Sequence, residues 1–363
     1  MDIKTKLRHD DYTVGWICTL PIELGAAQIM LDEVHEDLPT IQANDHNTYT
    51  LRRIWRHNVA IACLPSGESG KTFANTVALQ LLSSFHKIRF GLMVGIGGGV
   101  PNEKDIRLGD VVVSKPTDGY GGVVQYDFGK ALSGGNFQQT GILNRPPQVL
   151  LTAVTKLQGN HFSGGSKITN FLTEIKRTNV KFTRPAVEGR LCLSDYDHVD
   201  INSKSCSDCD ATKLVLRPHR SDDARYRVVK DSQMRDKLVK DLGILCGDGS
   251  SGVNESNDEW QGYAAAAAAA YAKELLSVVS VAHMVQTRTA QDALHNCACV
   301  LTKISDSASR FCVPLDLTAM PVIENFVGRQ DELERLWSYL RPKVRSREKL
   351  PFFMGSVVYG RHS

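Results

Sequence analysis

The chain has 363 residues, of which 42% are hydrophobic and 23% are charged, so it has the balance of an ordinary globular protein with a sizeable core. Its formal net charge of +3 is small for this length and argues against nucleic-acid or membrane binding as the main task. The nine cysteines show no disulfide-like spacing, residues 1–11 are unlike a signal peptide, and no apolar run is long enough to cross a membrane. We therefore expect a soluble cytoplasmic protein with reduced thiols.

The first part of the chain alternates between strand-like and helix-like segments. Tyr12–Leu20 is typical of a buried strand, and the next helix begins at Pro21, where the missing N–H costs nothing, and runs to about Val34. A predicted hairpin follows, with strands at Tyr49–Ile54 and Val59–Leu64 and a turn at Trp55–Asn58. After the Gly/Ser loop Ser66–Gly70, we expect a helix at Lys71–Phe85 and a strand at Phe90–Gly95. A glycine loop and the strand Val111–Ser114 come next. This alternation predicts an α/β fold with a twisted sheet covered by helices, which binds ligands at its glycine-rich strand ends.

The second part of the chain is less regular. We expect helices at Gln148–Leu157, Gln233–Leu242 and, because alanine has the best helix propensity, Trp260–Val279. Residues 159–225 are polar with few clear elements, and 247–257 form a solvated linker by composition. Residues 281–320 resemble a connector, Phe326–Leu340 is typical of an amphipathic helix, and 343–363 form a tail without a core of its own.

Two glycine-rich loops have sequences that are compatible with phosphate binding. In the first, Gly70-Lys71-Thr72 fits the end of a P-loop, but the required first glycine falls on Pro65, which has no N–H to donate. A tight loop before a buried helix explains this sequence better than a nucleoside triphosphate site does. In the second, Gly95–Gly99, four glycines in five positions allow close approach to a ligand, so exposed amides could hold an anion or a ribose hydroxyl. A crowded strand-to-loop crossing explains the same composition.

Several segments in order resemble the purine/uridine phosphorylase superfamily, in the version found at the N-terminus of fungal NLR-like (NB-ARC/NACHT) proteins. The resembling segments are Trp16–Leu24, Ile61–Thr72, Phe90–Pro101, Asp105–Pro116, Gly121–Lys130 and Glu259–Ala266. The resemblance covers about residues 12–280. It implies a three-layer fold with a twisted mixed sheet and cleavage of the N-glycosidic bond of a purine-type nucleoside by phosphate or water. Phosphate is then a co-substrate, and no cofactor or metal is implied.

The resemblance also implies site residues. Glu23 matches the helix-start glutamate that contacts the nucleophilic water in the hydrolase branch, although a carboxylate is also favoured there by the helix N-terminus. Ser66 and Gly67 match the first glycine loop, and Gly97 and Gly98 match the loop beneath the ribose and the nucleophile. Asp110, in the turn after Gly109, has the pattern of a structural residue. Members of the family often build their sites at dimer contacts, so the resemblance also implies a homo-oligomer.

Three departures from the family pattern bear on activity. Met93 and Ile96 stand where phosphorylases often place an arginine and a serine to hold phosphate. The second half lacks the Met-Glu-Ala ribose motif and an aspartate with the flanks of the acid that protonates the leaving base, with segments missing near residue 227 and at 247–257. The missing pieces include central strands, so we expect an incomplete sheet with an exposed edge.

Other features support weaker hypotheses. Cys206 and Cys209 form a CxxC pair that supplies half of a zinc site, and surface thiols explain it better. His57 lies in a predicted hairpin turn and is expected at the surface. Residues 321–342 resemble the lead-in to an NB-ARC or STAND NTPase domain, but no P-loop follows.

The sequence therefore leaves two main functions open. The domain is either a nucleoside phosphorylase or hydrolase, or a non-catalytic ligand-sensing or interaction module of a truncated NLR-like protein. A P-loop NTPase is the weakest alternative.

Overall fold

The computed structural model describes residues 4–39, 42–99, 105–116, 121–124, 129–131, 137–139, 143–186, 191, 209–218, 246–247, 258–293 and 352–360. The chain divides into two compact units, Met1–Gln291 with Leu350–Ser363, and Asp292–Lys349. All the helices and strands given below belong to the first unit. The predicted helices Gln233–Leu242 and Phe326–Leu340, and the segment 321–342, lie outside the described residues.

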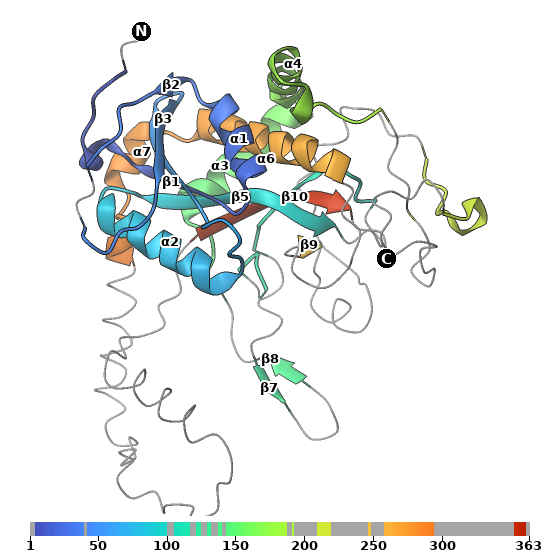
Figure 1. The fold of residues 1–363 in the computed structure, drawn as a ribbon, viewed down its shortest axis with the longest axis horizontal. Helices are drawn as coiled ribbons and strands as arrows, with labels where there is room; N and C mark the ends of the chain where they lie inside the picture. Colours follow the sequence, from blue (N-terminus) through green and yellow to red (C-terminus); the bar gives the residue numbers. More distant parts are fainter. Residues whose placement is uncertain are drawn as a thin grey trace, which may run out of the picture. The chain divides into compact units, whose positions relative to one another are not determined.

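A mixed sheet forms the centre of the first unit (Figure 1), with strand order β2-β3-β4-β1-β5-β10-β6. Its strands are β1 (Val14–Cys18), β2 (Glu33–Val34), β3 (Tyr49–Ile54), β4 (His57–Cys63), β5 (Phe90–Gly99), β6 (Val111–Val113), β9 (Cys246–Gly247) and β10 (Phe352–Gly360). Strands β4, β1, β5 and β10 run parallel, whereas β2, β3, β6 and the short β9, which pairs with β5, run antiparallel to their neighbours. A separate hairpin joins β7 (Gly129–Ala131) and β8 (Phe137–Gln139).

Helices cover both faces of this sheet, which confirms the expected three-layer α/β architecture (Figure 1). The helices are α1 (Pro21–Met30), α2 (Lys71–Ser84), α3 (Gln148–Phe162), α4 (Ile168–Thr178), α6 (Asp258–Val278) and α7 (Val281–Gln286). Helices α1, α3, α4 and α6 share one core with the sheet face that carries Trp16. Helix α2 lies on the other face, where a Cβ on Gly15 would come within 2.9 Å of Leu81.

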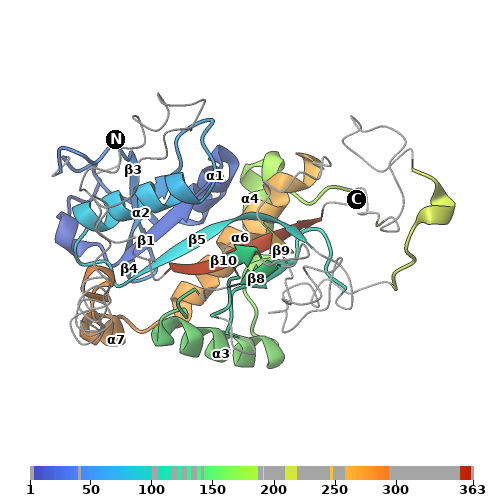
Figure 2. The same ribbon diagram turned by 90° about the horizontal axis from the view of Figure 1, so that it is seen from below.

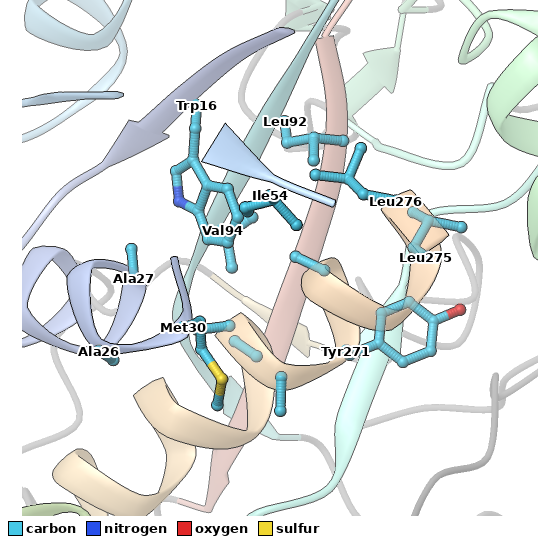
Figure 3. Close-up of a cluster of buried hydrophobic side chains, with 14 of the residues drawn as sticks. Trp16, Ala26, Ala27, Met30, Ile54, Leu92, Val94, Tyr271, Leu275 and Leu276 are labelled. Carbon is cyan, nitrogen blue, oxygen red and sulfur yellow. The ribbon is translucent and has the colours of Figure 1, made fainter. Parts of the chain in front are cut away.

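Helix α6 is the alanine-rich helix that the sequence predicts at Trp260–Val279, and it is buried on most sides. Figure 3 shows how Trp16, Leu92 and Val94 of the sheet face Met30 of α1 and the Leu275–Leu276 end of α6. The seven alanines from 264 to 270 are all at most 4% exposed. Because alanine has almost no side chain, α6 can approach the sheet and α1 closely on several sides at once. In the view from below, α6 crosses behind β5 and β10 (Figure 2).

His57 corrects one expectation. It was expected at the surface of a hairpin turn, but the structure makes it the first residue of β4 and leaves it only 2% exposed. Its Nε2 lies 3.1 Å from the carbonyl oxygen of Leu276 and 3.3 Å from that of Val279. These carbonyls end α6 and have no partner further along the helix, so the imidazole satisfies them. The turn before β4 is tighter than predicted, which moves His57 into the sheet.

Four other elements differ from the expectation. Helix α1 ends at Met30, and Glu33–Val34 pairs with β3 instead of extending the helix. Helix α4 lies within the stretch predicted to be irregular, since its polar residues are spaced for one apolar face, and α7 lies within the expected connector. Strand β5 continues to Gly99 instead of opening into a loop at Gly95.

Strand β10 is the largest difference between sequence and structure. Residues 343–363 were expected to be a tail and the sheet to have an exposed edge, but Phe352–Gly360 pairs with β5 on one side and β6 on the other. The segment is rich in aromatic and β-branched residues, which favour strands when a sheet is available to pair with. Its partners lie more than 230 residues earlier in the chain, so local sequence gave no signal for this pairing.

The close packing of α6 predicts that it tolerates no larger side chain. We expect Ala267→Leu to lower the free energy of unfolding by about 1–3 kcal/mol, because Ala267 is fully buried and its neighbours must shift. The same change at the exposed Ala282 of α7 should cost less than about 0.5 kcal/mol. Urea denaturation of the two variants measures both values, and equal losses would contradict the packing described for α6.

The buried His57 predicts a pH dependence of stability. Burial lowers the pKa of His57, so the unfolded chain takes up its proton first as the pH falls below about 6.5. The stabilisation is therefore present above that pH and lost below it, by at most about 1.4 kcal/mol per pH unit. We expect thermal unfolding between pH 7.5 and 5 to show a smaller pH dependence in His57→Gln than in the wild type. An equal pH dependence in the folded wild type and the folded His57→Gln variant would contradict this role of the buried imidazole.

Candidate functional site

Glu23 is a buried carboxylate at the start of α1, directly after β1. Its exposed fraction is 4%. The Oε2 atom accepts hydrogen bonds from the backbone N–H groups of Thr19 (2.7 Å) and Leu20 (2.9 Å). The third residue of the helix thus binds back to the residues that precede it, as the glutamate of a capping box does. This part of the contact explains why a glutamate suits this position even without a ligand.

The second carboxylate oxygen of Glu23 reaches the glycine-rich end of β5. The N–H of Ile96 donates to Oε1 over 2.7 Å. A Cβ on Gly95 would lie 2.6 Å from the same oxygen, so only glycine leaves room for the carboxylate there. The structure therefore brings together Glu23 and the Gly95–Gly99 segment, two features that lie more than 70 residues apart in sequence and that the resemblance places around one ligand.

The Gly95–Gly99 segment is a strand, which corrects the expectation of an open loop. Gly98 and Gly99 are in register with β9 on one side and with the last two residues of β10 on the other. Amides within a sheet are engaged with neighbouring strands, so they are not displayed as they are in an anion-binding loop. The anion-binding role of Gly97 and Gly98 stays a prediction.

The first glycine loop lies at the same edge of the sheet as Glu23. Strands β1 and β4 are parallel with Cys18 opposite Cys63, so the carboxyl ends of both strands meet there. Ser66 and Gly67 follow Cys63 in an exposed loop, in which Gly67 has a φ of 83°. A Cβ on Gly67 would meet nothing within 4 Å, so the positive φ and not crowding explains this glycine. The ligand role of Ser66 and Gly67 also stays a prediction.

Burial and charge together set the chemistry of Glu23 and its two cysteine neighbours. Burial raises the pKa of Glu23, and the hydrogen bonds from Ile96, Leu20 and Thr19 partly oppose this. Burial, and then the charge of Glu23, raise the pKa of both Cys18 and Cys63. The thiols are therefore held protonated and are poor nucleophiles, whereas a carboxyl with a raised pKa is better matched to proton transfer near neutral pH. The two cysteines are not singled out by the sequence, where their only signal is that each ends a buried strand.

Asp110 has the structural environment that its sequence pattern predicts. It is buried and accepts a hydrogen bond from the N–H of Arg107 over 2.9 Å. The preceding Gly109 has a φ of 81°, and a Cβ there would lie 2.5 Å from the ring of Tyr263. The turn is thus fixed against the start of α6.

The described residues contain no group of three or more His, Cys, Asp or Glu side chains arranged to hold a metal ion. Of the predicted CxxC pair, Cys206 lies outside the described residues and Cys209 is half-buried. Within the described part of the chain, none of the helices has the length and apolar character needed to cross a membrane.

Comparison with known proteins gives a partial likeness. No family model matches the chain. An NLR-like protein of Hyaloscypha variabilis is 33% identical in an alignment that covers 95% of this chain but only 35% of the length of that relative. Among solved structures, futalosine hydrolase of Helicobacter pylori is similar over 74% of this chain and 99% of its own length, with 13% identity and a TM-score of 0.36. The 5'-methylthioadenosine/S-adenosylhomocysteine nucleosidase of Streptococcus pneumoniae is similar over 40% of this chain and 57% of its own, with 23% identity and a TM-score of 0.27.

The influence of the Glu23 charge on the cysteines gives a prediction that needs no ligand. We expect Glu23→Gln to lower the pKa of the Cys63 thiol, because a negative charge beside it is removed. Alkylation of Cys63 at pH 8, followed by peptide mass spectrometry, should become about two- to tenfold faster.

Two controls make this measurement specific. Glu68→Gln removes a charge from the exposed loop after β4 and should leave the rate at Cys63 unchanged. Continued protection of the fully buried Cys18 would show that the Glu23→Gln chain remains folded. An unaltered rate at Cys63 in a folded Glu23→Gln chain would mean that the two side chains do not interact.

Proposed function

We propose that this unit binds a purine-type nucleoside at the Glu23 edge of the sheet and that Glu23 activates a water molecule to cleave its N-glycosidic bond. The observation that carries the proposal is the buried carboxylate of Glu23, held by the N–H of Ile96 at the glycine-rich end of β5. The ordered segments that resemble the nucleoside phosphorylase superfamily support the same proposal. In that resemblance Glu23 is the residue that contacts the nucleophilic water.

The hydrogen bonds of Glu23 leave one acceptor position of its carboxylate unused. A carboxylate has about four acceptor positions, and backbone N–H groups occupy three of them. The remaining position on Oε1 can accept a hydrogen bond from a water or a ribose hydroxyl. As the water attacks the anomeric carbon, its proton passes to the carboxylate while the bond to the base breaks with its electron pair staying on the base. The raised pKa of Glu23 makes it a stronger base than an exposed glutamate.

Water suits this site better than phosphate does. Met93 and Ile96 offer no cationic or hydroxyl side chain, and the amides of the surrounding strand lie within the sheet. The Glu23 carboxylate, when ionised, would repel an anion next to it. These features favour hydrolysis over phosphorolysis.

A second candidate function is a ligand sensor without turnover. The leaving base needs a proton from an acid, and the chain lacks both the aspartate and the Met-Glu-Ala ribose motif that the family supplies. The relative in Hyaloscypha variabilis is described as NLR-like, and this chain spans about a third of it. A nucleoside that binds at Glu23 and is not cleaved would then act as a signal. A homo-oligomer stays a prediction in either case.

Calorimetry and a product assay with adenosine and inosine, with and without phosphate, test both candidates. We expect binding of at least one nucleoside and slow release of its free base without phosphate. Glu23→Gln should lower the rate by about 10²- to 10⁴-fold, because the carboxylate that takes the proton of the water is removed. Glu68→Gln should leave the rate unchanged. Binding without release of the base would favour the sensor, and a folded chain that binds no nucleoside would reject both.

A further inference from the structure

The sheet contains a position that only a distant segment of the chain fills. Between β5 and β6 lies β10, which reaches this place after the whole of the second unit, Asp292–Lys349. All nine residues of β10 are in parallel register with Gly91–Gly99, and three of them are in antiparallel register with Val111–Val113. Helix α6 packs across β10, so the strand is central and not an edge addition. The position is therefore a groove with backbone donors and acceptors on both sides and a helix over it.

The glycine-rich half of β5 depends on this neighbour. Strand β1 pairs with β5 only as far as Met93, whereas β10 continues alongside to Gly99. Four of the five residues Gly95–Gly99 are glycines, which lose more entropy than other residues when fixed in a strand. Beyond Met93, the extended conformation is held on the β1 side by Glu23 at Ile96 and by β9 at Gly98–Gly99, and on the other side by β10.

One residue links the groove to the candidate site. Val357 of β10 is in register with Ile96 of β5 and with Val111 of β6. Ile96 in turn donates its N–H to Glu23. In a parallel sheet, backbone groups of successive residues face opposite neighbours, so Gly95 and Gly97 face β10 while Ile96 faces Glu23. Pairing with β10 thus fixes the segment that supplies the donor of Glu23.

We infer that the groove between β5 and β6 is a docking surface for a parallel β-strand, that its ligand is the C-terminal segment 352–360 of this chain, and that docking of this segment holds Ile96 against Glu23. The strand binds as a tethered peptide adds to a sheet, through main-chain hydrogen bonds on both sides. The docking itself does not depend on the proposed nucleoside chemistry. Its influence on a ligand at Glu23 does rest on that proposal.

The covalent connection between residues 352–360 and the rest of the chain determines which measurement can detect the docking. A covalent connection gives an attached segment an effective concentration on the order of millimolar, so a free peptide cannot compete with it at ordinary concentrations. Cleavage of the connection removes this advantage. A specific protease site inserted after Lys349 lies at the boundary of the second unit, so after cleavage of the folded chain residues 350–363 stay in place only through their contacts with the rest of the first unit.

The first measurement is size-exclusion chromatography of the cleaved chain. We expect the fragment 350–363 to co-elute with the remainder. A synthetic peptide of residues 349–363 in 100-fold excess should displace it. The same peptide with Val357→Pro should fail, because proline lacks the N–H and cannot pair in a central strand. The peptide with Val357→Thr keeps the N–H and the branched side chain and should displace the fragment as well as the wild-type peptide does.

The second measurement is amide hydrogen exchange of the intact chain without any ligand. We expect Val357→Pro to speed exchange in Phe90–Gly99 at least tenfold, while α2, on the opposite face, keeps its protection; Val357→Thr should behave as wild type. If Val357→Pro unfolds the whole chain, the peptide competition on the wild-type sequence still decides the docking. Hydrogen exchange of Phe90–Gly99 is then measured on the cleaved chain after the Val357→Thr peptide has displaced the fragment, and this sample is the folded reference.

Each contradicting outcome of these experiments overturns a different part of the proposal. Immediate loss of the fragment on cleavage, or displacement by the proline peptide, would overturn the docking of 352–360. Unchanged exchange in Phe90–Gly99 of a folded Val357→Pro chain would overturn its link to Ile96. A higher-order species whose mass shows exchange of the strand between two copies would overturn the assignment to a segment of the same chain. None of these results depends on whether a nucleoside binds.

Discussion

The arrangement of the candidate site depends on one buried carboxylate that bridges the ends of two strands. Glu23 binds the backbone just before its own helix and the backbone of β5 with its two oxygens. A carboxylate in such surroundings is costly unless its lone pairs are used, and three N–H donors offset much of this cost. The same contact requires glycine at position 95, because any side chain there would collide with the carboxylate. The charge of Glu23, the start of α1 and the glycine at position 95 therefore depend on one another.

Much of the fold was predictable because its signals are local. The Pro21 helix start, the strand Val14–Cys18 and the alanine helix at 258–278 follow from propensity and periodicity. His57 and β10 were not predictable in this way. The burial of His57 depends on the end of α6, more than 200 residues away, and the pairing of β10 depends on a vacancy in the sheet that no neighbouring residue signals.

The closeness of Glu23 to the glycine-rich segment could be predicted from the family resemblance, whereas the geometry of the candidate site could not. The family resemblance selected Glu23 and the glycine segment, and the structure places them in contact. The resemblance could not indicate that Gly95–Gly99 remains a strand. Glycine allows both a loop and a strand, and the neighbouring strands determine which of the two forms. It also gave no reason to notice Cys18 and Cys63, whose closeness to Glu23 arises only when β1 and β4 align.

The position of α6 has a consequence for how much of the chain is needed to make a stable body. Most of the sheet lies before residue 114, yet the surface that buries Trp16, Leu92 and Val94 is supplied by residues 258–278. A polypeptide released after the last N-terminal strand would present this aromatic and aliphatic face to water, with only α1 to cover part of it. During synthesis the ribosome must add about 150 further residues before α6 emerges, so the nascent N-terminal half has to be shielded from self-association throughout that interval.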